Sequence, residues 1–287
     1  MPADPEALAI EAALEAERQF VLTLGGLALE IAGATLVTHE KLAVPRFNFV
    51  QEVGVGRERQ SGFFERALDH YFQRAIRPTF RVPLPVPDHL DQGLRRFGFL
   101  PKTSPLSLML ASGRSAPGPG DEFAVRPAER SELDRTAAFW TSERERPEFR
   151  MALDLAWNHP NPHERLVPLL ALRDGTPAAS ALVYRYRSSA GIHAVATAAP
   201  VRGQGAASAL VRYVLAQDPA GTPVRYSMFA DTARLATRLT ALGFETKRTF
   251  QEYVLPPDAN LAFPPPGPPT PPQWRPPRTS GRAGSSG

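Results

Sequence analysis

The chain of 287 residues contains no cysteine. It therefore has no disulfide framework, thiol nucleophile or thiolate metal site. It also lacks an apolar run approaching the roughly 18 residues that cross a bilayer. Its first residues, Met-Pro-Ala-Asp-Pro-Glu, lack the basic start and the apolar core of a secretory signal. We therefore expect a cytoplasmic protein with no membrane partner.

The chain has little excess charge of either sign. Lysine and arginine number 33 against 29 aspartates and glutamates, which gives a formal net charge of +4. Half of this excess lies in residues 256–287, which hold three arginines and one aspartate. Nucleic-acid binding needs cationic side chains clustered on one face, which a nearly neutral remainder does not indicate. We expect a small-molecule or peptide partner and no nucleic acid, with binding of nucleic acid by the tail as a minor alternative.

Proline is concentrated at the end of the chain. Eleven of residues 256–287 are proline, mixed with glycine, serine and arginine. Such a segment cannot bury a core, so we expect a disordered tail at 257–287. Turn-forming residues also dominate 112–120, which predicts a linker at 113–121. The length fits two domains and this tail, so we expect domains at 1–112 and 122–256.

The two expected domains share a pattern at an offset of 145 residues. Leu-x-x-Phe-Gly-Phe at 94–99 corresponds to Leu-x-x-Leu-Gly-Phe at 239–244. The same offset, carried upstream without a gap, aligns apolar stretches of both halves. The pattern indicates a tandem repeat.

The most informative segment is 192–207, in which an apolar strand leads through a turn with Arg202, Gly203 and Gly205 into an amphipathic helix. Glycine lets backbone N–H groups approach a diphosphate closely, and the first helical turn adds unpaired donors and the positive end of the helix dipole. The segment therefore predicts an anion site. The first half has Glu58 and Gln60 in place of the two glycines. A negative charge repels a diphosphate and a side chain blocks close approach, so we infer a degenerate first copy.

The spacing of apolar residues predicts the elements around this turn. Strands are expected at 166–172, 179–186, 192–198, 224–229 and 247–255, and helices at 206–215 and 232–242. We expect Asp231 to cap the second helix and Gly243 to end it in the left-handed conformation.

Arg202-x-x-Gly205-x-Ala207 after a strand, with Leu-Gly-Phe and a last strand further on, resembles the GCN5-related N-acetyltransferase (GNAT) superfamily. The acyl-CoA loop of that family reads Gln/Arg-x-x-Gly-x-Gly/Ala. The resemblance covers about residues 122–255 and implies an α/β fold of two GNAT-like domains, each a mixed, mostly antiparallel sheet flanked by helices. It also implies an N-acyltransferase that moves an acetyl group from acetyl-CoA to an amine by direct attack in a ternary complex.

The resemblance assigns the cofactor to nine residues of the strand and the loop: Val195, Ala196, Thr197, Arg202, Gly203, Gln204, Gly205, Ala206 and Ala207. A backbone N–H of the strand would stabilise the oxyanion. Members of the family often use a tyrosine as the acid where this chain has Leu239. Another hydroxyl, on Tyr226, Ser227 or Tyr253, could substitute, the thiolate could leave without help, or catalysis could be lost.

Two candidates for the general base remain. His193 shares a strand face with Val195 and titrates near neutral pH when unperturbed, although a purely structural histidine is the alternative. Glu145 belongs to a charged run at 143–148 that could shape the acceptor pocket or simply face solvent. We expect no metal, because the prolines at 160 and 162 prevent the helix that would align His159 with His163.

Three broader alternatives stay open. The chain could be a non-catalytic acyl-CoA sensor or scaffold whose tail recruits a partner. The glycines could merely form a tight turn. A dinucleotide-binding turn is disfavoured, because no acidic residue lies about twenty positions further on to hold a ribose. The sequence does not decide the oligomeric state, and a homodimer is one candidate.

Overall fold

The computed structural model describes residues 4–112, 122–140, 146–158, 166–217, 225–256 and 259. Residues 1–257 form one compact unit and residues 258–287 a second, and the fold below is that of the first unit. The expected linker at 113–121 and nearly all of the expected tail at 257–287 lie outside the described residues.

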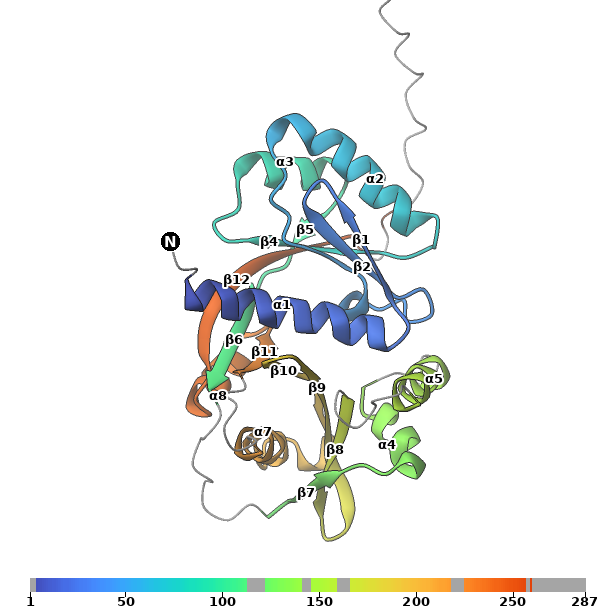
Figure 1. The fold of residues 1–287 in the computed structure, drawn as a ribbon, viewed down its shortest axis with the longest axis vertical. Helices are drawn as coiled ribbons and strands as arrows, with labels where there is room; N and C mark the ends of the chain where they lie inside the picture. The colour runs from blue at the N-terminus through green and yellow to red at the C-terminus, as the bar shows by residue number, and fades with distance from the viewer. Residues whose placement is uncertain are drawn as a thin grey trace, which may run out of the picture. The chain divides into compact units, whose positions relative to one another are not determined.

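Twelve strands form one sheet whose main path runs in the order β1-β2-β3-β4-β12-β6-β11-β10-β9-β8-β7, with β5 paired to β12 (Figure 1). Only β3–β4 and β10–β11 are parallel pairs on this path. The expectation of a mixed, mostly antiparallel sheet flanked by helices is confirmed. The strand bounds are β1 Leu27–Ile31, β2 Ala34–Thr38, β3 Phe49–Gln51, β4 Thr79–Pro83, β5 Leu100–Pro101, β6 Leu106–Ser112, β7 Ala124–Pro127, β8 Leu166–Arg173, β9 Thr176–Tyr186, β10 Ser189–Thr197, β11 Arg225–Ala230 and β12 Glu245–Val254.

The two sequence halves exchange strands at the centre of this sheet. The last strand, β12, lies between β4 and β6, which both belong to the first half. Strand β6 in turn pairs with β11 of the second half. The halves therefore share one hydrogen-bonded sheet, and the expected division into domains at 1–112 and 122–256 stays a prediction.

The helices of the described residues are α1 Pro5–Thr23, α2 Gln60–Phe72, α3 Asp88–Arg96, α4 Leu133–Ala138, α5 Arg146–Trp157, α7 Ala206–Ala216 and α8 Ala233–Ala241, with single 3-10 turns η1 Pro45–Phe47, η2 Arg57–Arg59, η3 Arg130–Glu132 and η4 Ala199–Val201. None of them combines the length and the apolar composition that a membrane crossing requires.

Helices α1 and α7 cover opposite faces of the middle strands. Leu182 and Tyr184 of β9 are buried in the cluster that contains Phe20 of α1. The alternate residues Ala181 and Val183 are buried with α7. Side chains alternate between the two faces of a strand, so α1 and α7 lie on opposite faces of β9. Helix α1, which belongs to the first half, contacts β9, β10 and β11 of the second half.

The offset of 145 residues relates helices as well as motifs. Helix α3 at 88–96 and helix α8 at 233–241 have the same length and differ by that offset, and the starts of α2 and α7 agree to within one residue. The tandem arrangement itself stays a prediction.

The helix cap expected at Asp231 is wrong by one residue. Thr232 has the extended conformation of an N-cap, and its Oγ1 accepts a hydrogen bond from the N–H of Leu235 at 3.2 Å. A threonine and an aspartate in adjacent positions both suit this role, so the sequence alone could not choose between them. Gly243 has the expected left-handed conformation, with φ of 91°.

Candidate functional site

The loop-bearing strand β10 separates from its parallel neighbour β11 part-way along its length. The two strands pair only through Ser189–Gly191 and Arg225–Ser227. Beyond that point the register of β10 with β9 shifts between His193 and Ala196, where β10 has one extra residue. Such a bulge bends a strand and increases its twist, and Ala194 at this place has a left-handed φ of 51°. Strand β10 therefore has, among the described residues, no paired strand on its β11 side beyond Gly191.

The turn that follows has the backbone that an anion site needs. Gly203 and Gly205 have φ of 83° and 99°, and open space surrounds the place where a Cβ would stand on either residue. Gly205 is the N-cap of α7, supplies no side-chain cap, and precedes a first turn without an acidic residue. Gln204 donates to the carbonyl of Pro200 at 3.2 Å and so fixes the turn. Among the described residues, no side chain caps the first N–H groups of α7.

A cationic hollow of about 380 Å³ adjoins this turn. Its walls are Thr197, Arg202 and Gly203 on one side and the start of α8 on the other, which contributes Arg234 and Arg238. Sequence reasoning missed these two arginines. Their spacing of four residues places them on one face of a helix, but only the tertiary fold brings that face to the loop.

A larger cavity of about 710 Å³ extends from the loop to the first half of the chain. Val195 of β10 and Ala207 of α7 line it at one end, and Glu17 of α1 and Arg81 of β4 at the other. The intervening wall is mostly apolar and includes Phe47. Of the nine expected cofactor residues, five line this cavity or the hollow, namely Val195, Thr197, Arg202, Gly203 and Ala207. Gln204 and Gly205 shape the turn, Ala196 ends the bulge and Ala206 lies in the core.

His193 lines the same cavity and stacks on Phe20 of α1, with ring centroids 4.1 Å apart and an interplanar angle of 5°. Its Nε2 is buried and has no hydrogen-bond partner among the described residues. Burial, helped by the nearby Arg81 guanidinium, lowers the pKa of His193 to about 3. The imidazole is therefore neutral and weakly basic at pH 7.

The other expected catalytic side chains lie elsewhere. Tyr226 is fully buried in the core between β10 and β6. The hydroxyl of Tyr253 donates to Asp91 Oδ1 of α3 at 2.7 Å, and burial raises its pKa. Neither tyrosine lines the cavity, whereas Leu239 does. Glu145 lies outside the described residues, as do His159 and His163.

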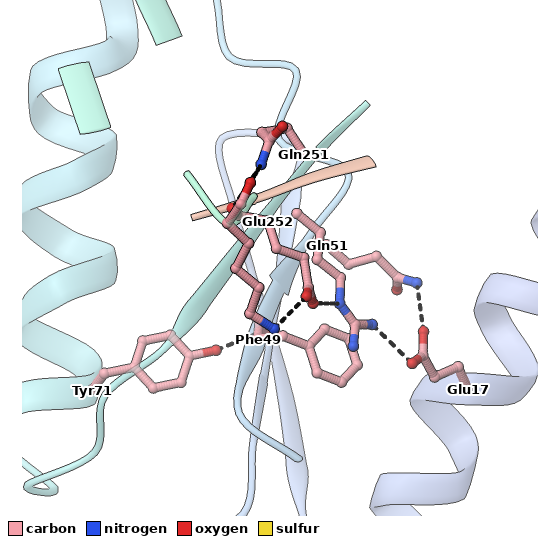
Figure 2. A network of polar contacts seen from close by, with 8 residues as sticks. Glu17, Phe49, Gln51, Tyr71, Gln251 and Glu252 are labelled. Carbon is pink, nitrogen blue, oxygen red and sulfur yellow. Dashed lines mark hydrogen bonds and ion pairs between the residues drawn. The ribbon is translucent and has the colours of Figure 1, made fainter. Parts of the chain in front are cut away.

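A cluster of charged side chains that line the cavity, three of them buried and Lys102 exposed, was not predicted (Figure 2). The guanidinium of Arg81 donates to Glu17 Oε1 at 2.8 Å and to Glu252 Oε1 at 3.2 Å. Lys102 Nζ donates to Glu252 Oε2 at 2.7 Å. Arg81 also lies over the Phe49 ring, 3.9 Å from its centroid. We call these four residues, Glu17, Arg81, Lys102 and Glu252, the charge cluster.

The model of the acetyltransferase (GNAT) family matches residues 131–233, which include β10, the glycine turn and α7. The chain carries a GNAT domain. The resemblance inferred from the loop motif is confirmed by this match. None of the curated proteins matches the sequence significantly.

Solved structures with a similar fold match most of the chain. A GCN5-related N-acetyltransferase from Kribbella flavida matches with a TM-score of 0.61 and 15% identity, over 85% of this chain and 95% of the other. A GCN5-related N-acetyltransferase from Sphaerobacter thermophilus matches with a TM-score of 0.59 and 17% identity, over 86% of this chain and 90% of the other. A conserved protein of unknown function from Staphylococcus epidermidis matches with a TM-score of 0.59 and 12% identity, over 81% of this chain and 94% of the other. At these identities the likeness shows the fold, and family and fold together support an acetyltransferase.

Proposed function

We propose that this protein transfers an acetyl group from acetyl-CoA to a primary amine, in a complex that holds both substrates. The observation that carries the proposal is the glycine turn before α7, where two left-handed glycines leave open space beside uncapped helix N–H groups. Helix N-termini of this kind bind phosphate groups.

The residues around the turn suit the chemistry of CoA. The helix N-terminus at Gly205 would hold the diphosphate. The hollow formed by Arg202, Arg234 and Arg238 would hold further phosphate oxygens, because arginine is well matched to phosphate. The cavity past Val195 and Ala207 shares Leu235 and Arg238 with the lining of this hollow. It would admit the acyl group and the acceptor.

The unpaired edge of β10 suits the acyl-transfer step. An attacking amine nitrogen forms the C–N bond with its lone pair, and the negative charge moves to the carbonyl oxygen. We assign a backbone N–H near Val195 to that oxygen, because donors fixed before the reaction stabilise developing charge. The oxygen's electron pair then re-forms the C=O bond while the C–S bond breaks with its electron pair on sulfur, and the proton that the neutral amine loses in becoming an amide goes to the thiolate or to water. Leu239 provides no acid, so this scheme uses none from α8.

The loop assignment is tested by calorimetric titration of CoA into the wild type and into Gly205→Glu. A carboxylate about 4 Å from a diphosphate charge costs about 4 kcal/mol at an effective dielectric constant of 20, so we expect at least a 100-fold loss of affinity. Gly33→Glu is the matched control, because Gly33 in the β1–β2 turn has φ of 86° and open space around it. Equal affinity of Gly205→Glu and wild type would remove the loop assignment.

The second candidate function is a non-catalytic acyl-CoA sensor or scaffold, favoured by Leu239 at the position of the usual acid. Release of thiol from acetyl-CoA across a panel of amines separates the two functions. We expect release with at least one amine, and binding of acetyl-CoA without any release would favour the sensor. A cytoplasmic location and a homodimer stay predictions of the sequence.

A further inference from the structure

The cavity connects the acyl-transfer end of the site to charged side chains of the other sequence half. Four acidic or histidine side chains line it: Glu17, His193, Asp231 and Glu252. Asp231 is exposed at the end of β11, near the cofactor hollow. The other three surround the deep end, where Phe20 bridges α1 and β10 by stacking on His193. An amine that approaches Val195 from the side away from the cofactor would meet these groups.

The two glutamates of the charge cluster differ in how fully their oxygens are paired. Glu252 has a cation on each oxygen, Arg81 on Oε1 and Lys102 on Oε2. Glu17 has Arg81 on Oε1, but among the residues that the structure describes Oε2 receives only a long contact of 3.4 Å from the amide of Gln51. An ionised carboxylate accepts more than one hydrogen bond per oxygen. Glu17 Oε2 therefore has the most remaining capacity for a cationic ligand.

The pKa shifts of these groups also favour Glu17 as the proton acceptor. Burial raises the pKa of Glu17 above its ordinary value of 4.5, opposed by Arg81 and Arg18 and aided by Glu252. Glu252 keeps a lowered pKa because Arg81 and Lys102 outweigh its burial. A carboxylate whose pKa is shifted toward the working pH is an effective proton acceptor. Burial lowers the pKa of His193, away from the working pH.

We propose that Glu17 on α1 binds the ammonium group of the acceptor and takes its proton, so that the first half of the chain supplies a catalytic residue to the second. The inference rests on the function proposed above. An N–H bond of the ammonium breaks, the proton forms an O–H bond with Glu17, and the nitrogen keeps the electron pair that attacks the acyl carbon. The apolar wall beside Glu17, formed by Phe20, Phe47 and Leu106, favours an acceptor with an apolar body.

The test uses the full chain, with n-butylamine and 2-phenylethylamine as probes. Calorimetry of each amine with the CoA-bound protein at pH 8 should show at least tenfold weaker binding to Glu17→Gln. Thiol release from acetyl-CoA should fall at least 100-fold, the lower range for loss of a general base, and the acid limb of the wild-type rate profile should disappear. The affinity for acetyl-CoA should not change. Glu11→Gln, on an exposed position of the same helix, is the control.

The outcomes separate the two proposals. If the wild type does not bind CoA, the proposed function is overturned. Normal CoA binding with no amine binding, or a Glu17→Gln variant with the wild-type rate and pH profile, would overturn only the role of Glu17. The role of Glu17 would also be overturned if the acid limb disappeared in His193→Gln or Asp231→Asn and not in Glu17→Gln. If Glu17→Gln fails to fold, the wild-type profile decides, because a rate that stays level down to pH 4.5 contradicts a base with a raised pKa.

Discussion

Replacement of Arg81 by methionine should destabilise the protein by about 3–5 kcal/mol at pH 8, the usual cost of leaving a buried ionic partner uncompensated. The side chains of Arg81, Glu17 and Glu252 are each no more than 8% exposed. The variant loses ion pairs of 2.8 Å and 3.2 Å. Methionine has a similar reach and preserves most of the packing against Phe49, so the change reports mainly on charge.

The loss should become smaller as the pH falls. Arg81 lowers the pKa of both glutamates, so its removal raises both folded-state values. A carboxyl whose folded pKa lies above its unfolded pKa binds more protons when folded, and stability then falls as the pH rises through the folded pKa. At pH 5.5 the two glutamates of the variant are closer to neutral, and the buried repulsion between them is relieved.

Urea unfolding of wild type and variant at pH 5.5 and pH 8 measures both effects. Arg95→Met is the control, because its ion pair with Asp91 is 50% and 32% exposed and solvent screens such surface pairs. A loss below about 1 kcal/mol for Arg81→Met, or the same loss at both pH values, would refute the reasoning. The double variant Arg81→Met/Glu17→Met should recover part of the loss, because it removes the carboxylate left without a cation, whereas Glu252 keeps its ion pair with Lys102.

Three further outcomes follow from single contacts. Gly191→Ala should lower stability by about 1–3 kcal/mol, because a Cβ there would lie 2.2 Å from Nε2 of His193; an unchanged melting temperature would contradict this placement. His193→Gln should reduce the loss of stability between pH 7 and pH 4, since the depressed pKa of about 3 makes the wild type lose stability as the pH falls below the unfolded value; identical acid sensitivity in urea titrations would contradict it. Tyr71→Phe should cost about 1–3 kcal/mol, because the buried hydroxyl shares its one proton between the carbonyls of Val37 and Phe49, which lie 2.8 and 2.9 Å away. Thermal unfolding measures the loss, and no loss would mean that this shared hydrogen bond contributes little.

Local sequence signals predicted most of the second half of the fold. Helix α7 begins at the expected Ala206 and ends within one residue of the expected end. Strand β8 was expected at 166–172 and spans Leu166–Arg173. These elements have apolar residues at regular spacing and glycine at their ends, so each is encoded by its own segment. The interleaving of β12 with β4 and β6 has no such local signal, because strand pairing depends on residues more than a hundred positions apart.

The candidate site likewise has a part that the sequence predicts and a part that it does not. The loop was predictable because its chemistry depends on backbone conformation, which glycines at 203 and 205 reveal directly in the sequence. The charge cluster was not, because Glu17, Arg81 and Glu252 come from three separate elements and no spacing relates them. His193 was placed correctly on the loop-bearing strand. Its low pKa follows from burial near Arg81, which a sequence does not show.

The turns that precede α2 and α7 differ at the position of Gly205. Gln60 stands one residue before the position that corresponds to the start of α7, and its amide donates to the carbonyl of His89 at 2.5 Å. A Cβ on Gly93, which corresponds to Arg238, would lie 1.7 Å from the Gln60 amide nitrogen. In the first half the side chain of Gln60 thus occupies the place that Gly205 has in the second, and a cavity of about 390 Å³ lined by Gln60 and Gly93 lies beside it. Helix α1 and β4 of the first half reach the candidate site elsewhere, where they bring Glu17 and Arg81 to the shared cavity.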